Sequence, residues 1–265
     1  MPKWIVGALG LLAVLMIPGG GDCQDRMEGE GLVDSRSAWG RVLERHYSKG
    51  GLDYAALQER RQDLDIFLAS LESADPDALG VPAQIAFWVN AYNAVVVHFV
   101  LERYPGLDSV KGVEGFFDEI RYPVAGQQLT LDELESRARA LGDARVHFAV
   151  VCASTSCPDL RPEPYRGEDL EAQLEDSTRR FLADTSKGLS WSPGEDDLGL
   201  SSIFKWYAGD FTGGSTVVAF FARGKVLAWI QPHLPASLAK EIEEQEPSIR
   251  YMDYDWSLND HRRGK

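Results

Sequence analysis

Basic residues are scarce in this chain of 265 residues, and their shortage narrows its possible partners. Lys and Arg total 27 against 41 Asp and Glu, which gives a formal net charge of -14 at pH 7. Because such a charge repels phosphate groups, nucleic acid and anionic membrane surfaces are poor candidates. We expect an unidentified small molecule or protein as the partner.

Several signatures of catalysis and ligand binding are also missing. The sequence contains no glycine-rich phosphate loop, no G-x-S-x-G and no H-E-x-x-H. Cys152, Cys157, His147 and His98 could supply soft metal ligands, but zinc sites usually carry a second paired set of ligands, and here there is one pair. We therefore predict no metal and no cofactor.

The N-terminus has the features of a secretory signal. Lys3 provides a positive charge, residues 4–17 are apolar, and Gly19–Gly21 are the small residues that follow. The apolar run is shorter than the roughly 20 residues of a spanning helix. We therefore predict a signal peptide at residues 1–23, a periplasmic or extracellular location, and no stable membrane span after the signal is removed.

The rest of the chain lacks an internal linker rich in proline, glycine or serine. Residues 24–36 are polar and predict a flexible tether, which leaves one globular domain over residues 37–265. Cys23 follows the apolar run closely, so attachment of a lipid there is a minor alternative to a soluble exported protein.

Hydrophobic periodicity predicts an α+β fold, a helix-rich domain around a small sheet. Residues 84–104 are apolar nearly all round, which predicts a central helix. Helices are expected over residues 38–47, 52–71, 84–104, 131–140, 169–182, 201–211, 217–229 and 237–246. Strands are expected over residues 121–124, 127–130, 145–151, 189–191, 198–200 and 249–254.

Reactive residue types are densest around residues 145–151 and the turn that follows. The predicted strand would deliver Cys152 to an exposed turn of small residues. A thiolate nucleophile needs a base or a positive charge nearby, and His147 and Arg145 are the local candidates. His147 and Cys152 would point to opposite faces of the strand, so that only a twist at its end would let them meet.

Polar side chains in the central helix are the other candidates. Asn90 and Asn93 lie on one face of it, and either Asn90 or His98 could serve as the partner of Cys152. Alternatively, the two amides hold loop backbone, such as the cysteine turn. A buried amide without partners would cost about 1 to 3 kcal/mol, which favours that structural role.

The two cysteines also have a structural interpretation. In an oxidising compartment a disulfide between Cys152 and Cys157 is favoured over a reactive thiol by roughly two to one. The four residues between them are small and suited to a turn. Such a short loop would stabilise the fold by only about 2 kcal/mol.

Four blocks of the sequence together resemble the Domain-of-Unknown-Function 547 family. They are residues 87–94 (FWVNAYNA), 147–158 (HFAVVCASTSCP), 202–207 (SIFKWY) with Asp210-Phe211, and 254–259 (YDWSLN). The resemblance extends over residues 52–259 and implies an exported, bacterial-type member with no settled activity. In one departure, Leu134-Glu135-Ser136 stands where the family often has Ile-Glu-His or Ile-Glu-Asn.

Three hypotheses follow. The first is a thiol-dependent hydrolase or acyl transferase with Cys152 as nucleophile, His147 as base, and Asn90 or Asn93 orienting the reactants or forming an oxyanion site. The second is a non-enzymatic exported domain that binds a ligand or partner and carries a Cys152–Cys157 disulfide. The third, thiol–disulfide exchange, lacks the two-residue spacing of known redox motifs.

Binding residues are expected among the special side chains set in apolar segments. We predict that Asn90 and Asn93, Cys152 and Cys157, and the tail at residues 254–259 converge on one concave site. The binding candidates are Tyr92, Trp88, Arg145, Cys157, Asp255 and Trp256.

Overall fold

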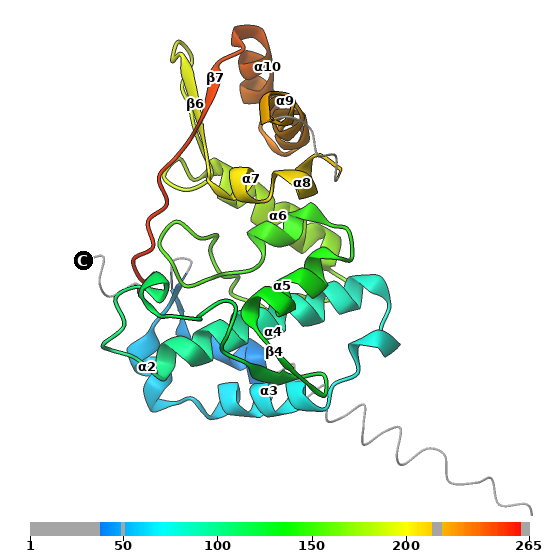
Figure 1. Ribbon diagram of the computed structural model, residues 1–265, viewed down its shortest axis with the longest axis vertical. Helices are drawn as coiled ribbons and strands as arrows, with labels where there is room; N and C mark the ends of the chain where they lie inside the picture. The colour runs from blue at the N-terminus through cyan, green and yellow to red at the C-terminus, as the bar shows by residue number, and fades with distance from the viewer. Residues whose placement is uncertain (1–37, 49–50, 214–218, 261–265) are drawn as a thin grey trace, which may run out of the picture.

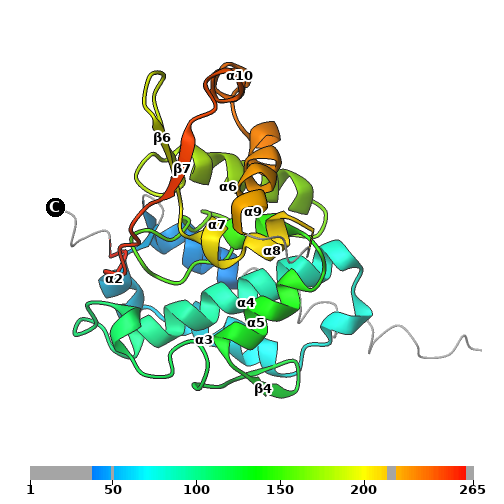
Figure 2. The same ribbon diagram turned by 45° about the horizontal axis from the view of Figure 1, so that its top comes forward.

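The apolar helix α4 (Val81–Leu101) runs through the middle of the structure (Figures 1 and 2). The computed structural model describes residues 38–48, 51–213 and 219–260. By length and composition α4 could cross a membrane, but it is mostly buried by other elements of the fold. It packs along α5 (Leu131–Arg139) and also contacts α2 and α3. The prediction of a central core helix is therefore confirmed.

The remaining elements are short. The other helices are residues 38–46, α2 (Tyr54–Glu59), α3 (Gln62–Glu72), α6 (Leu170–Ala183), α7 (Ile203–Trp206), α8 (Ala208–Phe211), α9 (Ala219–Ile230) and α10 (Ala236–Gln245), with 3-10 turns η1 (Pro76–Ala78), η2 (Val110–Gly112), η3 (Ala144–Phe148) and η4 (Gln231–His233). The strands are β1 (Tyr47–Ser48), β2 (Gly51–Leu52), β3 (Tyr122–Val124), β4 (Gln127–Leu129), β5 (Leu189–Ser190), β6 (Asp197–Leu200) and β7 (Ser248–Tyr251).

The strands form three small sheets. β1 and β2 are an antiparallel pair, as are β3 and β4, while β5, β6 and β7 form a sheet in which β6 and β7 are parallel. The β3–β4 hairpin turns at Ala125 and Gly126, both with positive φ, as a two-residue turn of this kind requires. Helix-rich α+β architecture is thus confirmed, with three small sheets in the described ranges rather than one.

Across the described residues, the core consists of two hydrophobic clusters. The larger surrounds α4, and the smaller gathers side chains of α6–α10 and β5–β7. In Figures 1 and 2, β6, β7 and α10 lie at one end and α2 and α3 at the other. η3 joins the clusters, because Val146 belongs to the larger and Phe148 packs on Phe181 of the smaller, with ring centroids 5.0 Å apart. The segment that leads to the cysteines is therefore anchored in both.

The strand predicted at residues 145–151 is wrong. Residues Ala144–Phe148 form η3 instead, and no strand among the described residues pairs with this segment. Asn93 of α4 replaces a sheet neighbour: its amide donates to the carbonyl of Ala149 (2.9 Å) and accepts from the N–H of Val151 (2.8 Å). A tertiary contact therefore overrides the β propensity of the valines.

Most other predicted elements are present with small shifts at their ends. The helix predicted at residues 52–71 is divided into α2 and α3, and the one predicted at 201–211 into α7 and α8. The capping box predicted at Thr130 and Glu133 is confirmed at the start of α5. The signal peptide at 1–23, the lipidation option at Cys23 and the tether at 24–36 lie outside the described residues, and the domain boundaries stay predictions.

We expect the replacement Asn93→Ala to lower the free energy of unfolding by about 3 kcal/mol, because it leaves a buried carbonyl and a buried N–H without partners. Asn90→Ala is the matched control, since Asn90 makes the same two bonds to Tyr165 at a partly exposed position that water can reach. Urea denaturation measures both. An Asn93→Ala loss no larger than that of Asn90→Ala would contradict the account.

Candidate functional site

A cavity of about 240 Å³ lies where α4, α5, η3, α7 and the C-terminal tail meet the cysteine turn. Its lining combines reactive and aromatic side chains, some of them from distant parts of the sequence. The polar and aromatic members are Tyr92, Phe117, Asp132, Glu135, His147, Cys152, Cys157, Trp206, Tyr207 and Trp256.

The cysteine turn, residues 152–157, is held by backbone bonds to the C-terminal tail. The N–H of Ser156 donates to the carbonyl of Asp255 (3.1 Å), and the N–H of Asn259 donates to the carbonyl of Ala153 (3.0 Å). Ala153 has a φ of 61°, a left-handed conformation that costs a non-glycine residue about 1 to 2 kcal/mol. The tail therefore stabilises a strained backbone directly after Cys152.

Cys152 and Cys157 are both buried free thiols. Their sulfurs lie 3.1 Å apart, a hydrogen-bond distance well beyond the roughly 2.05 Å of a disulfide bond. The N–H of Cys152 also donates to the sulfur of Cys157 (2.9 Å). The disulfide that the sequence favoured is therefore not present in the structure, although the turn does bring the two sulfurs together.

The surroundings of Cys152 favour its thiolate. Its sulfur is also 3.0 Å from the hydroxyl of Ser154 and 3.6 Å from that of Tyr254. Hydrogen bonding from Cys157, followed by Ser154 and Tyr254, lowers the pKa of Cys152 against the opposing effect of burial. Burial and the neighbouring Cys152 raise the pKa of Cys157. Cys152 is therefore the sulfur that ionises first.

Glu135 is a site residue that the sequence analysis missed. Its side chain is only 9% exposed, and its Oε1 accepts no hydrogen bond from any residue in the described ranges. Burial raises the pKa of Glu135 to about 7, against hydrogen bonding from Tyr207. A signal existed, because Glu135 shares the apolar face of α5 with Leu131 and Leu134, where a carboxyl group is unexpected.

His147 lies between the carboxyl groups of Asp210 and Glu135. Its Nε2 lies 2.8 Å from the carboxylate of Asp210, which also accepts from Arg139. Since a carboxylate is an acceptor, Nε2 carries the proton and leaves Nδ1 as an acceptor, 3.8 Å from Oε1 of Glu135. Burial, and then the charge of Arg139, lowers the pKa of His147 to about 4. The imidazole is therefore neutral at pH 7.

The predicted convergence on one concave site is met in part: Cys152, Cys157 and Trp256 of the tail line the cavity, whereas Asn90 and Asn93 do not. Two other sequence candidates, Tyr92 and His147, also line it. The expectation that His147 and Cys152 point to opposite faces of a strand does not apply, because residues Ala144–Phe148 form η3 instead of a strand.

Two further candidates support the turn without lining the cavity. Asn93 holds the backbone just before it, which is the structural role that the sequence left open. Asp255 bonds to Ser156 through its backbone, and its side chain accepts from Ser257.

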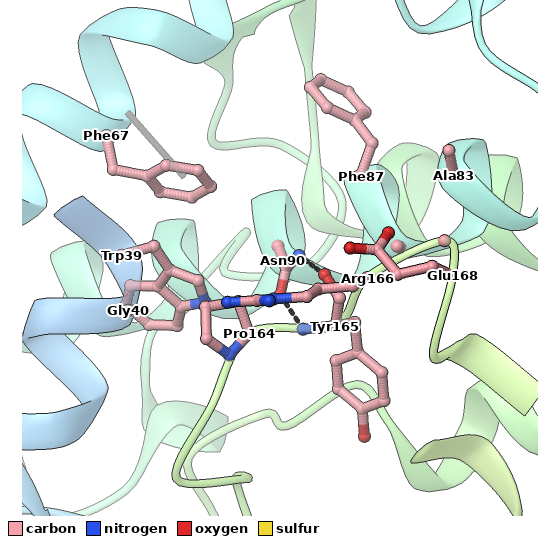
Figure 3. Close-up of a pocket in the computed structure, with 12 residues that line it drawn as sticks. Trp39, Gly40, Phe67, Ala83, Phe87, Asn90, Pro164, Tyr165, Arg166 and Glu168 are labelled. Carbon is pink, nitrogen blue, oxygen red and sulfur yellow. Dashed lines mark hydrogen bonds between the residues drawn. The ribbon is translucent and has the colours of Figure 1, made fainter. Parts of the chain in front are cut away.

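The remaining candidates lie elsewhere. Arg145 pairs with Asp143 and Glu171, outside the cavity. Trp88 is buried in the larger hydrophobic cluster. His98 lies 3.1 Å from a guanidinium nitrogen of Arg61. Asn90 lines a second cavity, where it bonds to the backbone of Tyr165 (Figure 3).

The opposite pKa shifts of Glu135 and His147 predict opposite effects of pH on stability. The contribution of Glu135 to the free energy of unfolding is fully present below pH 4.5 and is lost as the pH rises to about 7. The contribution of His147 is fully present above pH 6.5 and is lost as the pH falls to about 4. Between pH 4.5 and 6.5, Glu135→Gln should therefore gain stability relative to wild type as the pH rises, and His147→Gln should lose it. Each change should be at most about 3 kcal/mol.

Urea denaturation at several pH values tests this pair of variants. Curves that run parallel to the wild-type curve would show that the two groups are not shifted as described.

Comparison with known protein families matches a segment of the chain that contains part of this site. Residues 76–182 match the model of the family described as protein of unknown function, DUF547. No curated protein and no solved structure matches the chain. The matched region contains Glu135, His147 and both cysteines of the turn, while Tyr207 and Tyr254 lie beyond it. This part of the chain is therefore similar to DUF547, as the sequence blocks indicated.

Proposed function

We propose that the protein is an exported thiol-dependent enzyme that hydrolyses or transfers an acyl group, with Cys152 as its nucleophile. The observation that carries the proposal is the position of Cys152: its sulfur has three hydrogen-bonding neighbours and lines the same cavity as the buried carboxyl group of Glu135. A nucleophile and an acid facing one cavity are the minimum for acyl transfer. Export rests on the N-terminal sequence.

In the first step, the thiolate of Cys152 attacks the carbonyl carbon of the substrate and forms a tetrahedral intermediate. As the bond to the leaving group breaks, Glu135 donates its proton to the leaving atom, which departs neutral. The product is a thioester on Cys152 and a Glu135 carboxylate. A carboxyl group with a pKa of about 7 can give up and regain a proton near neutral pH.

In the second step, a water molecule or an acceptor alcohol or amine attacks the thioester. The Glu135 carboxylate takes the proton of the attacking group, and the carbon–sulfur bond breaks to release the acid, ester or amide and restore the Cys152 thiolate. His147 acts through Glu135 in this scheme. Its Nδ1 faces the carboxyl group, and Asp210 fixes the orientation of the ring.

Two other functions remain as outcomes of the test. A non-enzymatic binding domain would carry an oxidised Cys152–Cys157 pair and no reactive thiolate. Thiol–disulfide exchange is favoured by the 3.1 Å separation of the sulfurs and would require both cysteines. Acyl transfer requires only Cys152, so that replacement of Cys157 separates these functions.

The experiment uses 4-nitrophenyl acetate with the reduced protein and intact-mass detection. We expect one acetyl group on the wild-type chain and none on Cys152→Ala. Cys157→Ser, which keeps a hydrogen-bond donor beside Cys152, should still be acetylated. Nitrophenolate leaves without protonation, so Glu135→Gln should be acetylated normally but lose the acetyl group about 100-fold or more slowly, because its general base is missing.

Glu243→Gln is the control for the change in charge, because Glu243 is an exposed residue of α10. Absence of acetylation at Cys152 would remove the acyl-transfer proposal. A protein isolated without free thiols and unreactive after reduction would favour the binding domain, and loss of acetylation in Cys157→Ser would contradict a mechanism that needs only Cys152.

A further inference from the structure

A second cavity, of about 380 Å³, lies on the other side of α4 from the thiol site's reactive groups and shares no lining residue with that site. Trp39 and Phe67 form one wall, with their rings stacked 5.7 Å apart, and Phe87 contributes a further aromatic ring (Figure 3). Cavities of this size with aromatic walls are typical of small-molecule sites.

The loop that closes this cavity is fixed before any ligand binds. The side-chain amide of Asn90 bonds to both the carbonyl (2.8 Å) and the N–H (3.0 Å) of Tyr165. Gln173 holds the neighbouring residues, by accepting from the N–H of Arg166 and donating to the carbonyl of Pro164. Because the loop is already ordered, a ligand that binds here loses little binding free energy to ordering it.

Two opposite charges project from this fixed loop. Figure 3 shows the Arg166 side chain extended across the cavity beside Pro164 and Trp39, and the carboxylate of Glu168 turned toward the side of Asn90 and Phe87. Neither side chain has an ion pair or a side-chain hydrogen bond with another residue in the described ranges. The cavity therefore offers one cationic and one anionic group to a ligand, next to aromatic walls.

We propose that this cavity binds a small zwitterion with an aromatic group, an aromatic amino acid or dipeptide. Arg166 takes the carboxylate, Glu168 takes the ammonium group, and the ring lies against Phe87, which is only half-buried, whereas Trp39 and Phe67 are 1% and 5% exposed and form the floor behind it. The guanidinium of Arg166 suits a carboxylate because it offers two parallel N–H donors. This site is independent of the thiol chemistry proposed above.

Three probes with the same phenylethyl skeleton separate the contributions: L-phenylalanine, 3-phenylpropionate without the ammonium group, and phenethylamine without the carboxylate. Calorimetric titration of the whole protein should show L-phenylalanine binding tightest. Arg166→Gln should weaken the binding of L-phenylalanine and 3-phenylpropionate by about tenfold and leave the binding of phenethylamine unchanged. Glu168→Gln should weaken the binding of L-phenylalanine and phenethylamine by about tenfold and leave that of 3-phenylpropionate unchanged. Arg166→Lys, which keeps the charge, should recover part of the loss.

The controls are Arg250→Gln on β7 and Glu243→Gln on α10, exposed positions that line neither cavity. Cys152→Ala should bind L-phenylalanine as tightly as the wild type does. Failure of the acyl-transfer proposal and failure of this binding proposal can therefore be told apart. No heat of binding with L-phenylalanine, or equal affinity in Arg166→Gln, would overturn the assignment. Equal affinity for L-phenylalanine and 3-phenylpropionate would overturn the role of Glu168.

Discussion

The hydrogen bonds between Asn93 and the backbone around residue 150 are the interaction on which the site depends. The segment from η3 to the cysteine turn pairs with no strand in the part of the chain that the structure describes, and the amide of Asn93 bonds instead to Ala149 and Val151. The C-terminal tail then fixes the turn from the other side. Cys152 is thereby presented to a cavity that side chains from both hydrophobic clusters enclose.

Burial and hydrogen bonding have opposite effects on the two reactive groups of this cavity. The guanidinium of Arg139 lies 3.8 Å from Oε1 of Glu135, but burial outweighs this charge and the hydrogen bond from Tyr207, so that the carboxyl group stays partly protonated near pH 7. Cys152 is as buried, but the hydrogen bonds from Cys157, Ser154 and Tyr254 outweigh burial and favour its thiolate. One cavity therefore holds an acid that keeps its proton and a thiol that releases it.

Much of the fold could be predicted from the sequence, because periodicity and capping are local signals. The central helix and the capping box at Thr130 are examples. Long-range contacts could not be predicted this way: the strand expected at 145–151 gives way to Asn93, and Asn90 bonds to a loop 75 residues away. Cys152 was found by residue type, whereas Glu135 acquires its character only from burial in the fold.

The rate of alkylation of Cys152 as a function of pH is the most direct test of this account. Reduced protein is treated with iodoacetamide, and the labelled peptide is quantified by mass spectrometry in wild type and in Cys157→Ala. The account predicts that wild-type labelling reaches half its maximal rate well below the ordinary thiol pKa of about 8.5, and that Cys157→Ala shifts this midpoint upward. A wild-type midpoint at or above about 8.5, unchanged in the variant, would contradict it.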